Sequence, residues 1–121
     1  MSAEAADGVR RVFDLKALAS GKVDWKPWRE GVDICRLYGD GETGPAAALL
    51  RYAPNAEVPF HEHRGYEHIF VLAGEQEDAS GVYPAGTMVV NPPGSRHRVR
   101  APGGCTVLIV WERPVELLGD H

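Results

Sequence analysis

The segment FHEHRGYEHIF, residues 60–70, gathers side chains that can bind a metal ion. Residues two apart on a strand point to the same face, so His61 and His63 can converge on one point. A turn follows His63, and Glu67 begins the next run, which returns its carboxylate to the two imidazoles. The pattern H-x-H-x3-E therefore predicts three ligands of one metal site, although on its own it is weak evidence.

A fourth candidate ligand, His97, ends the later segment GTMVVNPPGSRH, residues 86–97. The glycines and prolines of this segment predict turns that bring a distant strand across the first segment. Three imidazole nitrogens and one carboxylate suit one divalent transition metal ion, such as iron, zinc, manganese or nickel. Calcium is not expected, because it takes mostly oxygen ligands.

Other interpretations of these residues remain open. The three histidines can instead be surface or hydrogen-bonding residues, and Glu67 can orient a histidine without binding the ion. His68 has the opposite strand parity to Glu67, so we expect it at the surface or in an interface. Only one of Arg51 and Tyr52 can face the metal, and the sequence does not decide which. An inward arginine would offer a charge for an anionic ligand.

The elements that must position these ligands are short β-strands. Turn signals rich in glycine and proline recur along the chain and separate runs of β-branched and aromatic residues, which predicts an all-β sandwich or barrel. The segment DLKALAS, residues 14–20, predicts a short helical turn with Asp14 as its N-cap. The runs expected to form strands are VDICRLY (32–38), AALLRYA (47–53), HIFVLA (68–73), TMVVN (87–91), HRVR (97–100) and CTVLIVW (105–111).

Length and composition indicate one globular domain and exclude several partners. The 121 residues suffice for one domain, which we place at residues 11–121 after a flexible segment at residues 1–10. With a net charge of −4, the chain does not attract the phosphate backbone of a nucleic acid, so we expect no nucleic-acid partner. No run approaches the roughly 20 apolar residues that span a membrane, and the N-terminus is no secretory signal, so we expect a cytoplasmic protein. Cys35 and Cys105 have no C-x-x-C spacing and are expected to be reduced thiols.

The faces of the predicted strands carry two further expectations. The run at residues 105–111 is apolar at both parities, so both faces of that strand should be covered. One face can line the interior, and the other needs the N-terminal segment or a second subunit, so we expect a homodimer. The basic residues that alternate along a later strand are typical of one polar strand face: Arg96, Arg98 and Arg100.

The two ligand segments resemble the signatures of the cupin superfamily. The first signature, G-x5-H-x-H-x3-E-x6-G, is matched up to Gly74, with Asn55 in place of the leading glycine. The second, G-x5-P-x-G-x2-H-x3-N, is matched from Gly86 to His97, with Ala101 in place of the final asparagine. Neither missing residue is a metal ligand in the family, so the departures concern turn geometry and not the ligand set.

The surrounding sequence is similar to the ChrR-like cupins, over about residues 11–113. That subfamily includes the C-terminal domain of zinc-binding anti-sigma factors and small diketone-type dioxygenases. The resemblance implies a cupin jelly-roll β-barrel, also called a double-stranded β-helix, with the metal inside, which agrees with the strand pattern. It rests on the segments WKPWREGV (25–32), LLRYAPNAEVPFHEH (49–63), YPAGTMVVNPPGSRH (83–97) and GCTVLIV (104–110).

The first functional hypothesis is a divalent-metal-dependent enzyme. Four protein ligands leave one or two open positions on a five- or six-coordinate ion, as a catalytic metal needs. Dioxygenase chemistry on a small, oxygenated, diketone-like substrate is the most specific form of this hypothesis. The sequence names neither the substrate nor a catalytic residue beyond the ligands.

The alternative is a non-catalytic metal-binding sensor or small-ligand module related to the anti-sigma cupin domain. Direct sigma-factor binding is not expected, because the chain has no room for the N-terminal helical domain of those relatives. A third hypothesis, a cupin-type isomerase, would need a positioned acid–base pair that the sequence does not reveal.

Overall fold

Ten short strands and one helix form the regular structure of residues 10–119, which are the residues that the computed structural model describes. The flexible segment predicted at residues 1–10 therefore lies outside the described residues, except for Arg10. The elements are α1 (Leu15–Ala19), β1 (Lys26–Arg29), β2 (Val32–Tyr38), β3 (Ala46–Tyr52), β4 (Ala56–Glu62), β5 (Glu67–Asp78), β6 (Gly81–Pro84), β7 (Met88–Asn91), β8 (Arg96–Ala101), β9 (Cys105–Trp111) and β10 (Glu116–Leu117).

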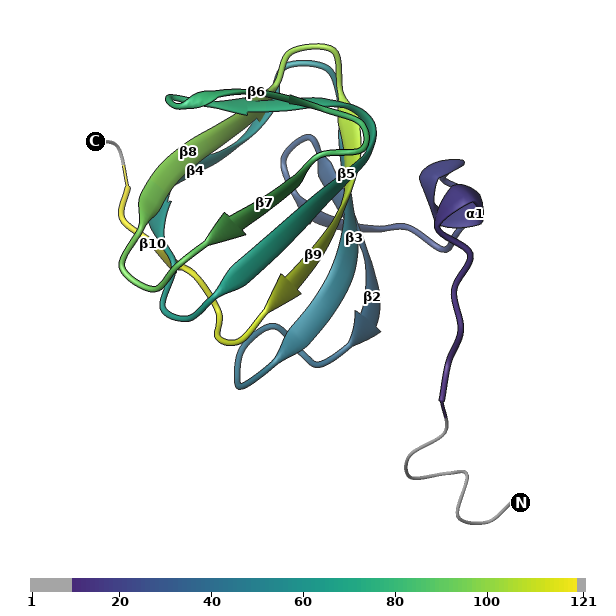
Figure 1. Ribbon diagram of the computed structural model, residues 1–121, viewed down its shortest axis with the longest axis horizontal. Coiled ribbons are helices and arrows are strands. Elements are labelled where there is room, and N and C mark those ends of the chain that lie inside the picture. Colours follow the sequence, from purple (N-terminus) through teal and green to yellow (C-terminus); the bar gives the residue numbers. More distant parts are fainter. Residues whose placement is uncertain (1–9, 120–121) are drawn as a thin grey trace.

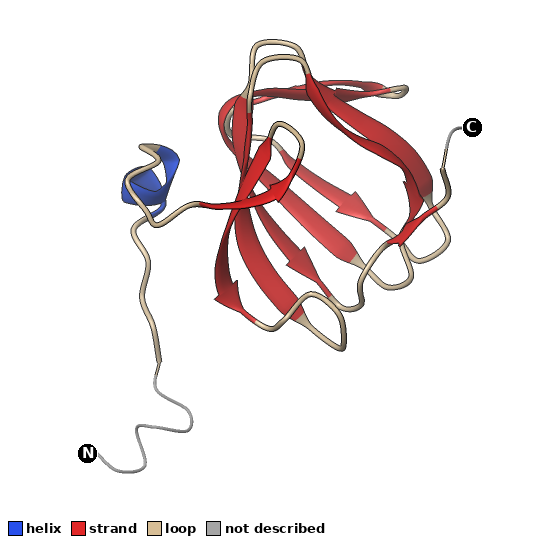
Figure 2. Ribbon diagram, turned by 180° about the vertical axis from the view of Figure 1, so that it is seen from behind, coloured by secondary structure: helices blue, strands red, loops and turns tan. Residues whose placement is uncertain are grey.

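The strands form one antiparallel sheet that curls into a barrel (Figure 1). Neighbouring strands follow the order β1-β2-β3-β9-β5-β8-β4-β10, and both β6 and β7 pair with β5. Figure 2 shows the two layers of the barrel from behind, with the helix outside them. The all-β barrel predicted from the turn spacing is therefore confirmed.

Strand β5 belongs to both layers of the barrel. Its first half pairs with β7 and β9, and its second half pairs with β6 and β8. The register shifts between Val71 and Ala73, and Gly74 follows with φ +74°. A side chain at Gly74 would collide with the Gly104 carbonyl, so only glycine allows this bend. Because the strand continues through the bend to Asp78, the prediction that it ends at residue 73 was wrong.

The other strand predictions are mostly confirmed. Strands β2 and β9 have the predicted bounds, β7 begins one residue later than predicted, and β3 and β8 differ from theirs by one residue at each end. The short strands β1 and β10 were not predicted, and neither was β6, which overlaps glycine- and proline-containing turn signals. Its four residues are too few to show an alternating pattern beside glycine and proline.

The two departures from the cupin signatures lie side by side. Asn55 adopts φ +68°, the left-handed conformation that a glycine would take at this turn. Its backbone N–H donates to the carbonyl of Ala101, the residue that replaces the final asparagine, at 2.8 Å. Asparagine is among the residues that tolerate this conformation, so the turn before β4 is kept.

The barrel interior is apolar, and the structure shows which of Arg51 and Tyr52 faces it. Tyr52 points into the core and is 3% exposed. Arg51 points outward, where it forms an ion pair with Asp33 at 2.9 Å. Its guanidinium carbon lies 4.5 Å from the centroid of the Trp25 ring. The inward arginine that an anionic ligand could use is therefore not Arg51.

The helix forms as predicted. The Asp14 carboxylate accepts a hydrogen bond from the Lys16 backbone N–H at 2.9 Å, which satisfies an otherwise unpaired donor of the first turn. Leu18 is buried, and Gly21 follows the end of the helix with φ +77°. Among residues 10–119, no helix has the length and apolar character needed to cross a membrane. Both predicted free thiols, Cys35 and Cys105, are present as such.

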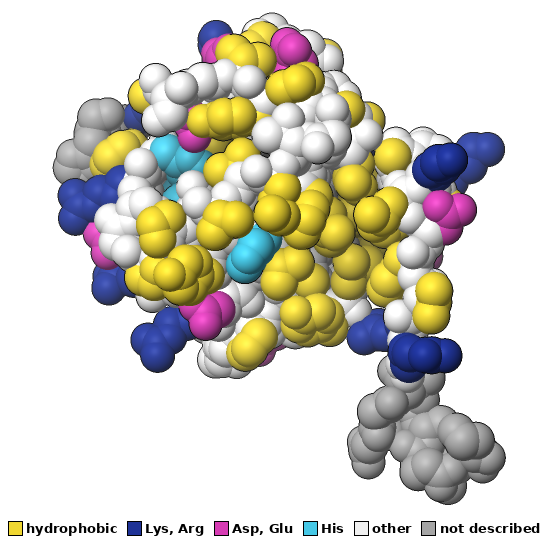
Figure 3. All heavy atoms as spheres, viewed as in Figure 1, with side chains coloured by type: hydrophobic (Ala, Val, Ile, Leu, Met, Phe, Trp, Pro, Cys, Tyr) yellow, Lys and Arg dark blue, Asp and Glu magenta, His cyan; other side chains and the backbone are white. Residues whose placement is uncertain are grey.

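Apolar side chains gather on the outer face of the sheet formed by β3, β9, β5 and β7 (Figure 3). One row across it joins Leu49, Leu108, Phe70 and Met88. Leu49 is fully buried and α1 packs against β5, but Met88 on β7 is 54% exposed. The homodimer expected to cover this face stays a prediction.

Replacement of Met88 and Val90 by lysine should convert the predicted dimer to a monomer. Both side chains are exposed on β7, so the fold tolerates the change, whereas an interface would bury two unpaired charges. Sedimentation equilibrium measures the mass. Val82→Lys on β6 is the control, because Val82 is equally exposed but lies on another strand. A wild-type monomer, or a double variant that still dimerises, would show that this face is not the interface.

Candidate metal centre

The four predicted ligands meet inside the barrel. His61 lies near the end of β4 opposite His97 of β8, His63 follows β4, and Glu67 opens β5. One ligand atom from each residue lies within 4.8 Å of all the others, and the group can hold a metal ion. The three imidazole rings have centroids 4.6–5.0 Å apart and face one another edge to face.

A bulge in β4 aims His61 into the barrel. The β4–β8 register shifts between Val58 and His61, and Pro59 lies inside the shifted segment. Proline has no N–H to lose from the ladder, so a bulge accommodates it. The Pro59 carbonyl then lies 2.8 Å from His61 Nδ1. The local sequence therefore positions both the ring and its hydrogen-bond partner.

Hydrogen bonds at Nδ1 fix the tautomer of all three histidines. His61 Nδ1 contacts the Pro59 carbonyl, and His63 Nδ1 contacts the Ser95 carbonyl at 3.0 Å. His97 Nδ1 lies 3.0 Å from a carboxylate oxygen of Asp78. Carbonyl and carboxylate oxygens only accept, so each Nδ1 carries the proton and each Nε2 presents a lone pair.

The Nε2 atoms fit a metal ion. Those of His63 and His97 are buried and have no hydrogen-bond partner, which is costly unless a ligand satisfies them. His63 Nε2 also lies 3.1 Å from Glu67 Oε1. Two or more imidazole nitrogens beside one carboxylate are donors that first-row transition metals accept. The donor set and its burial therefore fit the divalent ion predicted from the sequence.

Electrostatics keep the ligands in their metal-binding protonation states. Burial lowers the pKa of His61 to about 4, and burial likewise lowers the pKa of His97, against the opposing effect of Asp78. Burial raises the pKa of Glu67, but the contact with His63 and the neighbouring imidazoles outweigh it, so its pKa is lowered. Near neutral pH His61 and His97 are therefore neutral and the Glu67 carboxylate is ionised, as metal binding requires.

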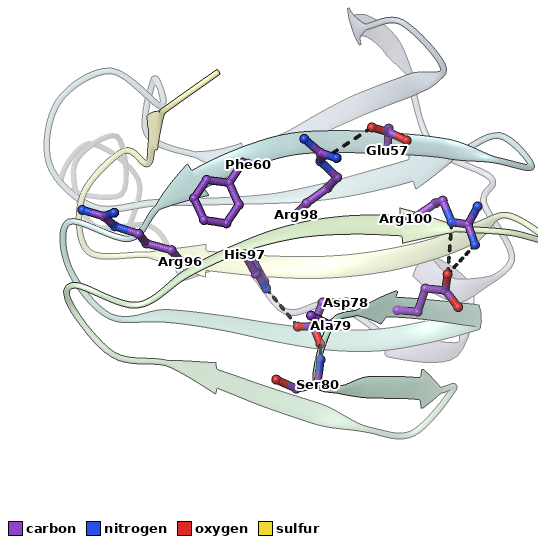
Figure 4. A pocket seen from close by; sticks show the side chains of 10 residues that line it. Glu57, Phe60, Asp78, Ala79, Ser80, Arg96, His97, Arg98 and Arg100 are labelled. Atoms are coloured by element: carbon purple, nitrogen blue, oxygen red, sulfur yellow. Dashed lines mark hydrogen bonds and ion pairs between the residues drawn. The ribbon is translucent and has the colours of Figure 1, made fainter. Parts of the chain in front are cut away.

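Asp78 is a functional residue that the sequence analysis missed. Figure 4 shows its carboxylate directed at His97 from the far end of β5. The same carboxylate accepts hydrogen bonds from the Tyr83 hydroxyl and from the Ser80 backbone N–H, both at 2.8 Å. A carboxylate that holds a ligating histidine raises the basicity of that ligand and fixes its orientation. No spacing signal links it to His97, because the bend in β5 brings the two together.

Glu67, like His97, has a hydrogen-bond partner on another part of the sheet. The Asn91 side-chain amide donates to Glu67 Oε1 at 3.2 Å, across the pairing of β5 with β7. His68, the next residue, points to the outer face, as its strand parity predicted. The remaining histidine, His121, lies outside the described residues.

A small cavity lies beside the ligands. Its volume is about 30 Å³, and His61, Glu67 and His97 share its lining with apolar and aromatic side chains of the barrel. Two polar side chains also line it, those of Tyr52 and Gln76. Burial raises the pKa of Tyr52, so its hydroxyl stays protonated. Gln76 is 1% exposed and its Nε2 has no partner, which leaves an N–H donor beside the candidate metal site.

The predicted polar face of β8 is confirmed and lines a groove outside the barrel. Figure 4 shows this groove, in which Arg98 and Arg100 each face an acidic side chain. Arg100 binds Glu77 at 2.6 Å, and Arg96 and Arg98 lie within ion-pair distance of other glutamates. Because these charges are compensated, the groove offers an anion little attraction.

The fold and the buried ligand group define a cupin. The model of the ChrR cupin-like domain family matches residues 15–116, so the chain belongs to this family. The resemblance seen in the two signatures is thereby confirmed.

The chain is also similar to three known proteins. A candidate dimethylsulfoniopropionate lyase, DddL from Cereibacter sphaeroides, is 26% identical over 96% of this chain, and the chain spans 56% of that protein's length. The anti-sigma factor ChrR of Rhodobacter sphaeroides, solved in complex with SigE, is 26% identical with a TM-score of 0.67, covering 92% of this chain and 65% of ChrR. An acetylacetone dioxygenase from Acinetobacter johnsonii shares the fold at 17% identity, with a TM-score of 0.73 over 94% of this chain and 79% of that one.

Asp78→Ala should weaken metal binding about 10- to 100-fold, because His97 loses the partner that orients it. Asp78→Asn, which keeps an acceptor but not the charge, should fall between this variant and the wild type. His97→Ala, which removes a ligand, should lose more. Competition with a chromogenic chelator measures the affinity. Asp33→Ala is the matched control, since Asp33 binds only the outward Arg51. Wild-type affinity in Asp78→Ala would show that the carboxylate does not support the site.

Metal-free protein should lose stability as the pH falls from about 6.5, the ordinary histidine pKa, to about 4. In this window the unfolded chain protonates His61 while the folded protein keeps it neutral, so the unfolded state binds more protons. This residue alone should remove on the order of 3 kcal/mol from the free energy of unfolding. The lowered pKa of His97 acts in the same direction.

Urea unfolding of chelator-treated protein across this pH range tests the expectation. The His61→Asn variant should show a flatter pH dependence, whereas His68→Asn on the outer face should follow the wild type. A wild-type stability that is constant across the window would contradict the assignment of buried, neutral histidines.

Proposed function

We propose that the protein is a divalent-metal-dependent dioxygenase that acts on a small, diketone-like substrate. The observation that supports this most directly is the arrangement of the ligands: three Nε2 lone pairs and one carboxylate converge at the edge of an apolar cavity. The cavity lies beside these four side chains. A bound redox-active metal would supply a position for substrate oxygens and the electron transfer that reaction with dioxygen needs.

The residues around the cavity have separable tasks in this proposal. The apolar walls exclude water from the reacting groups. Gln76, which is 1% exposed, presents its unpartnered N–H to an oxygen of the substrate. A donor fixed by its neighbours contributes without reorganisation when charge develops on that oxygen. His61, His63, Glu67 and His97 hold the ion.

The similar proteins support the proposal as far as the class of substrate, a small molecule, is concerned. The acetylacetone dioxygenase of A. johnsonii shares the fold, and its named substrate is a small diketone. The named substrate of DddL, dimethylsulfoniopropionate, is likewise a small molecule. A barrel cavity of about 30 Å³ agrees with a reacting group of only a few atoms.

A non-catalytic sensing module is the second candidate. The observation in its favour is the similarity to ChrR, which is an anti-sigma factor and binds SigE. In this case the metal would hold the barrel together or bind a signal molecule without turnover. Zinc, which has no redox chemistry, would serve that role as well as iron.

Oxygen uptake by the iron-loaded protein separates the two candidates. Chelator-treated protein is loaded with iron(II) without air and mixed with acetylacetone in an oxygen electrode. Substrate-dependent uptake is expected, because two oxygens of the diketone can bind the ion and hold the reactants together. The uptake should vanish in His97→Ala and in zinc-loaded protein.

Gln76→Leu provides a sharper test of the cavity. It should retain iron but lower kcat/KM about tenfold, because the substrate oxygen loses its donor. If fully iron-loaded protein consumes no oxygen with acetylacetone, longer β-diketones or hydroxylated aromatic ketones, the sensing module becomes the better description.

A further inference from the structure

A second chamber lies at the mouth of the barrel, outside the cavity that the metal ligands line. Its volume is about 160 Å³. Four apolar residues line both spaces and therefore separate them: Trp28, Val58, Trp111 and Val115. We call the outer space the vestibule. A ligand that extends from the metal ligands toward solvent through this wall passes between the two tryptophans.

The vestibule has an uncompensated positive charge. Arg29 and Arg36 line it, and its lining contains no aspartate or glutamate. Among residues 10–119, neither arginine forms an ion pair with a carboxylate, and Arg29 Nε is buried without a hydrogen-bond partner. In the outer groove, by contrast, Arg96, Arg98 and Arg100 each lie within ion-pair distance of a glutamate, two of which Figure 4 shows.

A bulge places Arg29 at the mouth. The β1–β2 register shifts between Pro27 and Arg29, so strict alternation is broken and both Trp28 and Arg29 reach the vestibule. The guanidinium carbon lies 4.9 Å from the Trp28 ring centroid, which fixes its position. Its charge also acts on the Tyr52 phenol inside the barrel, lowering the pKa of Tyr52 against the larger effect of burial.

Arg36 reaches the same chamber from β2. Its Nη1 lies where a side chain at Gly41 would stand, 2.7 Å from the ideal Cβ position. The glycine, with φ +76°, thus leaves room for the guanidinium beside the mouth. Two planar, permanently charged donors then face one small chamber, which is the arrangement that binds a carboxylate.

We infer that the substrate carries a carboxylate at the end remote from the metal, and that Arg29 and Arg36 bind it. The inference rests on the proposed function and narrows its substrate class. The inner cavity, about 30 Å³, is much smaller than the vestibule of about 160 Å³, so the end of the substrate remote from the metal ligands lies in the outer space. The remaining chain crosses between Trp28 and Trp111 and places the carboxylate in the vestibule. A β-diketone with a carboxylate a few carbons away has this form.

Matched probes with and without the charge test the inference. Calorimetry of zinc-loaded protein, which binds without turnover, compares 4,6-dioxoheptanoate with its methyl ester and with acetylacetone. The carboxylate should bind at least about tenfold more tightly than the ester, because the ester cannot accept charge-assisted hydrogen bonds. The preference should fall as salt is added, since the vestibule opens to solvent.

Variants assign the preference to the two arginines. Arg29→Gln should reduce it about tenfold, Arg36→Gln less because Arg36 is more exposed, and Arg29→Lys should restore part of it. Affinity for acetylacetone, which has no carboxylate, should change far less than the preference does. Arg100→Gln removes the same charge from the outer groove and should leave the preference intact. Metal content and thermal midpoint verify that each variant is folded.

The outcomes separate this inference from the proposed function. Equal affinity for the carboxylate and the ester, no binding of either, or a preference that survives the double variant Arg29→Gln/Arg36→Gln would overturn the inference, even if acetylacetone drives oxygen uptake. A preference that depends on the arginines, in a protein that consumes no oxygen with any diketone, would support the carboxylate site and reject the dioxygenase.

Discussion

Three hydrogen bonds determine the geometry of the candidate metal centre. Each ligand histidine donates through Nδ1 to an oxygen, and the acceptors lie on Pro59, Ser95 and Asp78. These acceptors belong to the β4 bulge, the turn before β8 and the far end of β5, so the pairing of distant strands must be complete before the rings are oriented. The Nε2 lone pairs then face one point before any ion arrives. Such preorganisation of a site by its supporting residues is what makes ligand geometry accurate.

Charge balance explains why the site contains two carboxylates. The barrel interior is apolar, and an uncompensated divalent ion there would be costly. Glu67 lies beside the ion position, and Asp78 acts through His97, so two negative charges balance a charge of two on the metal. The imidazoles of His61 and His97 remain neutral because burial disfavours their protonation. The site is therefore neutral as a whole when loaded, although both of its acidic residues are ionised.

The four candidate ligands could be proposed from the sequence because their positions follow from local rules. His61 and His63 share a face through the period of a strand, and a turn of fixed length returns Glu67. Asp78, which contacts His97, and Arg29, which lines the vestibule, were not predictable in this way. Asp78 reaches His97 only because β5 bends at Gly74 and continues, whereas the sequence EQED after this glycine shows no apolar alternation. Arg29 reaches the mouth through a register shift, which depends on the pairing partner and leaves no pattern in the strand itself.

The burial of the ligands has a consequence for how the protein is supplied with its ion. His61, His63 and Glu67 are 3%, 1% and 4% exposed, so the barrel wall slows the exchange of a bound ion with solvent. Donor sets of this kind bind several divalent metals, with affinities ordered by the metal and not by the protein. The metal content of the isolated protein will therefore record the metal pools of the cell in which it folded, and the same chain produced in two hosts can carry two different ions.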